Sequence, residues 1–172
     1  MEILEFTLVF LPLLGFTCLI IDMGWAIYVR STLQYAVRQG CRYAVTSQYM
    51  PAVTDTVTHK TLGHYDSIRY KVATSAMGTL GAPFSGAGWS KISVNFYDPS
   101  NLTTPLAAPT SSASTKINVG GNIVEVVVSG FSLAPMLPIL RSSAALSFTA
   151  RSSDRMEASP VTIPPYAEGG AY

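Results

Sequence analysis

Few residues in this sequence have the types and spacing that catalysis or metal binding requires. The two histidines, His59 and His64, stand five residues apart in a segment expected to be a loop (HKTLGH), without neighbouring carboxylates to complete a metal site. No glycine-rich phosphate loop, nucleophile elbow or catalytic pair of acids is recognisable. We therefore expect no catalytic, metal-binding or cofactor-binding residue, no cofactor and no enzymatic activity.

The two cysteines do not form a disulfide within the chain. Cys18 and Cys41 fall on one predicted helix, roughly 34 Å apart at the helical rise, which is far beyond bonding distance. We interpret Cys18 as a residue facing lipid or a partner. Cys41 is interpreted as a small packing residue unless subunits pair through it.

The composition favours contact with lipid or with other subunits. Only 12% of the 172 residues are charged, 48% are hydrophobic and the net charge is +1. Without a cationic field, binding to nucleic acid through its phosphates is not expected. The low charge also disfavours a disordered chain or a freely soluble monomeric enzyme.

The apolar residues are concentrated in an N-terminal helical pattern. Residues 6–21 (FTLVFLPLLGFTCLII) carry no charge, and only Asp22 interrupts the apolar stretch before Arg30. A bilayer span needs roughly 20 apolar residues, so this stretch is long enough. The helix continues to about Gln48 through an apolar stripe at three- and four-residue intervals, formed by Ala26, Val29, Leu33, Ala36, Val37, Gly40 and Ala44. Arg30, Gln34, Arg38 and Arg42 define a solvated face. Met50-Pro51 ends a rod of roughly 70 Å.

A buried core helix and a cleavable signal peptide are the alternatives to a membrane span. Core helices rarely stay apolar all round for this length, and signal peptides begin with basic residues rather than with Glu2 and Glu5. The acidic start makes sense if a basic leader has been removed. The arginines after the span would place that flank in the cytoplasm, whereas a removed basic leader would reverse the topology, so both orientations stay open.

The remainder of the sequence predicts a small mixed head. A helix is expected over 66–79 with Asp66 as its N-cap, and antiparallel strands over 91–97, 122–131 and within 145–155. Residues 100–116 resemble an exposed loop, and an apolar loop with Pro135 and Pro138 joins the last two strands. The fold class is thus α+β, with a long helix packed on a sheet of three or slightly more strands and one short helix. We divide the chain into a helix (1–50), a globular head (51–157) and an extended tail (158–172).

Glu5 and Pro12 stand out within the apolar half. A carboxylate beside an uncharged run is costly to bury, so Glu5 either lies among lipid headgroups or needs a cation once the helix leaves lipid. The nearest such cation is an α-amino terminus, its own at Met1 or a neighbour's, and this pair would set subunit register. Pro12 removes one helical hydrogen bond and predicts a kink or a loosened turn.

Residues 5–45 resemble the N-terminal signature of TadE-like proteins, pilin-related subunits of tight-adherence (Flp/Tad) pilus systems. The features that carry the resemblance are Glu5-Phe6, Leu-Pro-Leu-Leu at 11–14, Asp22 with Gly24, Tyr28, and Arg38-x-Gly40-x-Arg42-Tyr43-Ala44. The valine strand at 123–128 and Arg155-Met156-Glu157 match more weakly. The resemblance implies that a prepilin peptidase removes a basic leader and that the helix anchors the subunit in the inner membrane before assembly. Trp25 departs from the pattern, since a charged or polar residue often follows the glycine.

The resulting hypothesis is a structural pilin-like subunit of the bacterial cell envelope, bound to the inner membrane before assembly and present in an extracellular filament afterwards. Its expected partners are copies of itself or sister pilins, the prepilin peptidase and the pilus assembly machinery. We assign assembly to Met1, Glu5, Phe6 and Pro12. Packing of the helix on the head is assigned to Leu33, Ala36, Val37, Gly40 and Ala44. A minor TadE-like pseudopilin that primes or tips a pilus and a non-polymerising single-pass envelope binding protein remain alternatives. A membrane-tethered hydrolase has no specific residue in its favour.

Overall fold

A computed structural model describes residues 2–48, 50, 53–57, 59, 61–106, 117–134 and 146–158. Helix α1 (Glu2–Val45) leads into a head that contains helix α2 (His64–Ser75) and the 3₁₀ turn η1 (Trp89–Lys91). Strands β1 (Ile92–Tyr97), β2 (Ile123–Leu133) and β3 (Leu146–Arg155) complete it. The α+β class, the long apolar helix, the second helix and the three antiparallel strands are confirmed. Within the tail, residues 159–172 lie outside the described residues, as do 107–116 and the two loop prolines.

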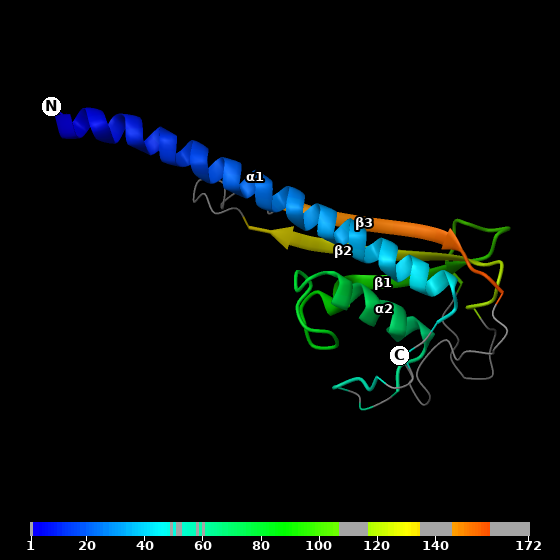
Figure 1. The fold of residues 1–172 in the computed structure, drawn as a ribbon. Coiled ribbons are helices and arrows are strands. Elements are labelled where there is room, and N and C mark those ends of the chain that lie inside the picture. Colours follow the sequence, from blue (N-terminus) through cyan, green and yellow to red (C-terminus); the bar gives the residue numbers. More distant parts are fainter. Residues whose placement is uncertain are drawn as a thin grey trace.

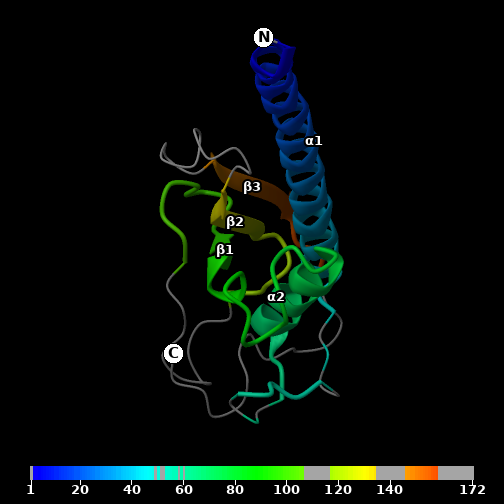
Figure 2. The ribbon, with the colours of Figure 1, turned by 90° about the vertical axis from the view of Figure 1, so that its left-hand side faces the viewer.

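The head has two layers, a sheet and a pair of helices on one of its faces (Figures 1 and 2). The strand order is β1-β2-β3, and both pairings are antiparallel. Alternate residues of β2 point to the helices, because successive side chains of a strand face opposite sides. Val124, Val126 and Val128 are therefore fully buried between the layers. Against them lie Ile92, Val94 and Phe96 of β1 and the head-bound half of α1.

The described part of α1 divides into two halves with different surroundings. Residues 3–25 project beyond the head, and Ala26 is the first buried residue. From there, buried positions recur every three or four residues, as expected of one helical face on a core. Val29, Leu33, Ala36, Val37 and Ala44 are 0–1% exposed. Residues 26–45 of α1 are therefore part of the core of the head.

Gly40 lies where α1 packs against Val72 of α2. A Cβ placed there would overlap Cγ2 of Val72, a fully buried residue of α2. We expect Gly40→Ala to destabilise the head by about 1–2 kcal/mol, because overpacking of about 1–3 kcal/mol exceeds the gain in helix propensity. In a Val72→Ala background the same change should become neutral or stabilising. Urea unfolding of the four variants in detergent measures this sign change, and an equal cost in both backgrounds would refute this close packing.

Helix α2 begins earlier and ends earlier than the sequence predicts. Its N-cap is Gly63, in an extended conformation, so the assignment of Asp66 as N-cap was wrong and Asp66 lies in the first turn instead. The Gly63 carbonyl accepts hydrogen bonds from both the backbone N–H and the hydroxyl of Ser67. These two hydrogen bonds anchor the first turn of the helix. At the other end Met77 (φ 50) and Gly78 (φ 82) adopt left-handed conformations, which terminate the helix before Thr79.

His64 was expected in a loop, and this was also wrong. It is the first residue of α2 and is fully buried, with Asn118 Nδ2 3.5 Å from its Nδ1. Burial lowers the pKa of His64 from 6.5 to about 4, although the nearby Ala44 backbone acts in the opposite direction. The ring is therefore neutral in the folded protein near pH 7.

We expect acid to destabilise the head through His64. The imidazole of His64 is protonated near pH 6.5 in the unfolded chain but only near pH 4 in the folded chain. Its contribution to the free energy of unfolding is therefore complete above pH 6.5 and is lost as the pH falls from 6.5 towards 4. Between pH 7 and pH 5 the free energy of unfolding should fall by about 2 kcal/mol from this residue alone. In a His64→Leu variant, the fall in the free energy of unfolding between pH 7 and pH 5 should be smaller by this amount. Urea unfolding in detergent at both pH values compares them, and identical losses would contradict the assignment.

The outer face of the sheet carries a buried acid that contacts both neighbouring strands. Glu125 on β2 is 7% exposed, and its Oε2 accepts hydrogen bonds from the Tyr97 hydroxyl (2.9 Å) and Asn95 Nδ2 (3.4 Å). Its Oε1 accepts one from Arg151 Nε (3.0 Å), and Arg151 forms an ion pair with it. Burial raises the pKa of Glu125, but these hydrogen bonds and the arginine charge outweigh burial and lower it. The network links the side chains of all three strands.

The β2–β3 pair continues beyond the core towards the projecting half of α1 (Figure 1). The register shifts between Val128 and Phe131, where Gly130 takes a left-handed φ of 68°. Pairing then resumes with Phe131 opposite Phe148 and Leu133 opposite Leu146. Bulges of this kind bend a strand and increase its twist.

Candidate functional site: an uncovered apolar helix

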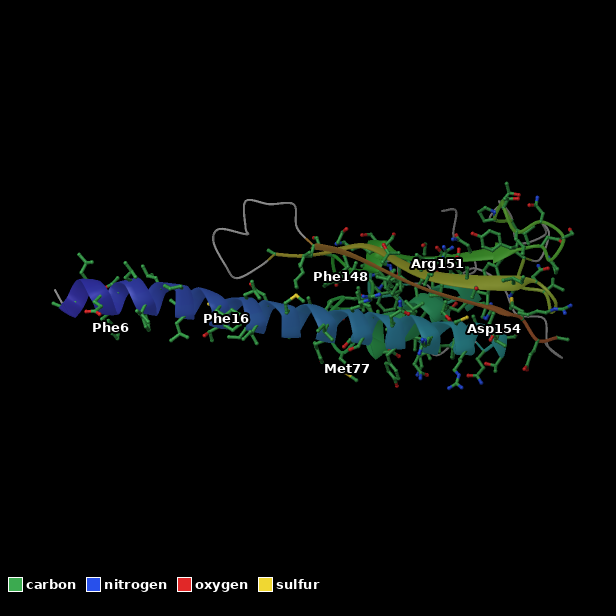
Figure 3. All side chains as sticks on the ribbon, turned by 90° about the horizontal axis from the view of Figure 1, so that it is seen from above. Phe6, Phe16, Met77, Phe148, Arg151 and Asp154 are labelled. Carbon is green, nitrogen blue, oxygen red and sulfur yellow. The ribbon has the colours of Figure 1, made fainter. Side chains whose placement is uncertain are left out.

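The largest apolar surface of the described chain is the projecting half of α1, residues 3–25, which we call the stalk (Figure 3). The exposed fractions of its large apolar side chains run from 43% at Leu19 to 84% at Ile3. Phe6 and Phe16 point outward from it (Figure 3). Apolar patches this large are rare on soluble monomers and mark contact with a membrane or another protein.

By length and composition, α1 can cross a membrane. Within the described part of the chain, α1 is the one helix that meets this condition. None of the residues in its most apolar window is buried by the rest of the chain. A core helix of a soluble protein would be covered by its own domain, which is not the case for the stalk. The stalk therefore has the surface that lipid, or a bundle of similar helices, would cover.

The hydroxyl groups of the stalk are satisfied within the helix itself. Thr7 Oγ1 donates to the Ile3 carbonyl at 2.8 Å, and Thr17 Oγ1 donates to the Leu13 carbonyl at 2.9 Å. In a medium without water an unpaired hydroxyl costs free energy, so these bonds reduce the cost of placing threonine there. The two threonines are compatible with burial in lipid.

The structure places Glu5, Phe6 and Pro12, three of the predicted assembly residues, in the half of the stalk away from the head. Phe6 is 67% exposed and stacks on Phe10, with ring centroids 5.5 Å apart. Pro12 lies inside α1, which is continuous from Glu2 to Val45. Among the residues described, Glu5 takes part in no recorded ion pair, while Met1 lies outside them. The proposed Glu5 partner thus stays a prediction.

The predicted packing residues lie together in the core, away from the assembly residues. Leu33, Ala36, Val37 and Ala44 are fully buried, and Gly40 faces Val72. On the other face of α1, Arg30, Arg38 and Arg42 are exposed and Gln34 is partly buried. The head thus covers one side of α1 and leaves its basic side in solvent.

A cavity of about 450 Å³ between α1 and β3 was not foreseen from the sequence. Two exposed arginines of α1 meet an acid of β3 at its walls, and its lining consists of Tyr35, Arg38, Gln39, Cys41, Arg42, Ser152 and Asp154. The helical spacing of Arg38 and Arg42 indicated a shared face, but only the tertiary fold brings Asp154 to them. Within the described ranges no group of three or more metal-ligating side chains occurs, and both cysteines are free.

The chain combines a two-layer α+β head with an uncovered apolar helix that is long enough to cross a membrane. Residues 3–42, about a quarter of the chain, match the family described as TadE-like protein, so the N-terminal segment is TadE-like. This family is a pilus-related structural family. No curated protein and no solved structure matches the chain. The match and the apolar helix together indicate a pilus-related protein anchored in the cell envelope.

Proposed function

We propose that this protein is a non-enzymatic pilin-like subunit that is anchored in the inner membrane through its stalk and then polymerises through the same helix into an extracellular filament. One observation carries the proposal: the stalk is apolar on all sides and uncovered, while the head closes its own core. Lipid and a helical bundle both match such a surface, so one helix serves before and after assembly.

The proposal assigns separate roles to the parts of the chain. Residues 1–50 are assigned to the anchor and filament core, 51–157 to the head on the outside, and 158–172 to the tail, of which 159–172 lie outside the described residues. Met1, Glu5, Phe6 and Pro12 act in assembly, while Leu33, Ala36, Val37, Gly40 and Ala44 hold the helix to the head. The partners are copies of the chain or sister pilins, a prepilin peptidase and the assembly machinery.

Electron microscopy of material shed from cells that make the protein tests this proposal. Filaments labelled along their length by an antibody to the head are the expected result. Label confined to filament ends would favour a minor pseudopilin that primes or tips the pilus. Protein confined to carbonate-washed membranes, with no labelled filament, would overturn polymerisation and favour a single-pass envelope binding protein. Recovery of the full chain as dispersed, water-soluble monomers would overturn membrane anchoring as well.

A further inference from the structure

One end of the head surrounds the point where the stalk leaves it. We call this the stalk-facing end and define it by described residues 26–33 of α1, 75–91 between α2 and β1, 128–134 of β2 and beyond, and 146–150 of β3. The antiparallel register brings Ile92, Val128 and Ala150 to neighbouring positions. Figure 1 shows these segments on the stalk side of the head.

The charges of the head are distributed unevenly between its two ends. At the stalk-facing end the residues defined above include two cations, Arg30 and Lys91, and no acidic residue. The nearest acid on α1 is Asp22, about one helical turn into the stalk. The acids of the sheet, Asp98, Glu125 and Asp154, lie towards the opposite end, as the strand register requires. Lys91 Nζ donates to the Gly130 carbonyl at 2.7 Å and lies 5.6 Å from the Phe131 ring centroid. This cation is thereby held at the base of the extended β2–β3 pair.

Apolar side chains accompany these cations. Met77 is 68% exposed and Leu146 is 49% exposed. Figure 3 shows Met77 and Phe148 at the stalk side of the head, with Arg151 and Asp154 farther from the stalk. On α1 itself the rings of Trp25 and Tyr28 stack with centroids 5.4 Å apart, immediately before Arg30. Aromatic side chains followed by a cation are typical of the boundary between a bilayer and water.

We propose that the stalk-facing end of the head docks on the anionic phospholipid surface of the membrane that the stalk crosses. The inference rests on the proposed membrane anchoring. Continuity with the stalk places this end next to the headgroups, and its two cations, Arg30 and Lys91, complement an anionic leaflet. Met77 and Leu146 enter the headgroup region. The opposite end, where the acids are accompanied by arginines such as Arg151 and Arg155, faces away from the membrane.

Site-specific fluorescence in vesicles tests the docking. The full chain, with Cys18→Ala and Cys41→Ala, receives one cysteine for an environment-sensitive dye at Leu146, at Leu102 or at Phe16. Leu102 is the matched control, because it is 60% exposed and lies in the turn after β1, away from the stalk. Each protein is reconstituted in phosphatidylcholine vesicles with or without phosphatidylglycerol, and quenching by a headgroup-attached spin label is measured.

With the anionic lipid, strong quenching at Leu146 and weak quenching at Leu102 are expected. Lys91→Gln should lower the ratio of docked to undocked heads about fivefold, the effect of one cation of about 1 kcal/mol near an anionic surface. Quenching at Leu146 as weak as at Leu102, with the Phe16 dye in lipid, would overturn docking while leaving the anchor intact. Equal quenching at Leu146 without phosphatidylglycerol would overturn the role of charge. A Phe16 dye in water would overturn the anchor and the docking together.

Discussion

Replacing Glu5 with Gln is expected to abolish assembly while leaving insertion into the membrane unchanged or improved. In the proposed filament the stalk of each subunit lies in an apolar bundle, where a lone carboxylate costs several kcal/mol unless a cation offsets it. A neighbour's α-amino group would supply that cation and fix the register between subunits. Glutamine keeps the shape but removes the charge. Membrane fractionation measures insertion, and negative-stain microscopy counts filaments.

Glu157→Gln provides the control for this prediction, because it removes one negative charge from an exposed residue of the head rather than from the stalk. That variant should both insert and assemble. Normal filaments from the Glu5→Gln protein would refute the charge pair and leave headgroup contact as the role of Glu5.

Leu33→Ala is expected to lower the free energy of unfolding of the head by about 3–5 kcal/mol. Leu33 is 0% exposed and lies among the buried residues of α1, α2 and the sheet. Truncation would remove apolar contact and leave a cavity that this closely packed core cannot fill. Urea unfolding in detergent, followed by fluorescence, measures the loss.

Leu13→Ala makes the same change on the same helix and serves as its control. Leu13 is 61% exposed on the stalk and has no role in the core. It should change the stability of the head by less than about 0.5 kcal/mol. Comparable losses in the two variants would show that the stalk contributes to the stability of the head, contrary to the division of α1 described above.

The elements of this fold with strong local periodicity could be predicted from the sequence. The stripe from Ala26 to Ala44 has the helical repeat, and the alternation from Ile92 to Phe96 has the repeat of a half-buried strand. The bounds of α2 could not be predicted, because burial of His64 and the left-handed Met77 decide them through tertiary contacts. Local capping preference alone pointed to Asp66.

In the candidate site, too, some features follow from the local sequence pattern and others depend on tertiary contacts. Uninterrupted hydrophobicity was sufficient to identify the stalk, because composition alone determines whether a helix can lie in lipid. The contacts of Glu125 with Tyr97 and Arg151 require the register of three strands, which separate segments of the sequence do not specify. The approach of Asp154 to Arg38 and Arg42 depends likewise on how β3 lies against α1.

The continuity of α1 from Glu2 to Val45 couples the direction in which the head faces to the rotation of the stalk about its own axis. The helix is continuous across the junction of its two halves at Trp25 and Ala26, so a rotation of one half is transmitted to the other. Inserting a single residue between Trp25 and Ala26 would turn the head by about 100° about the stalk. The azimuth of the head in a membrane or a filament is thus determined by the number of residues between its first buried turn and the tip of the stalk.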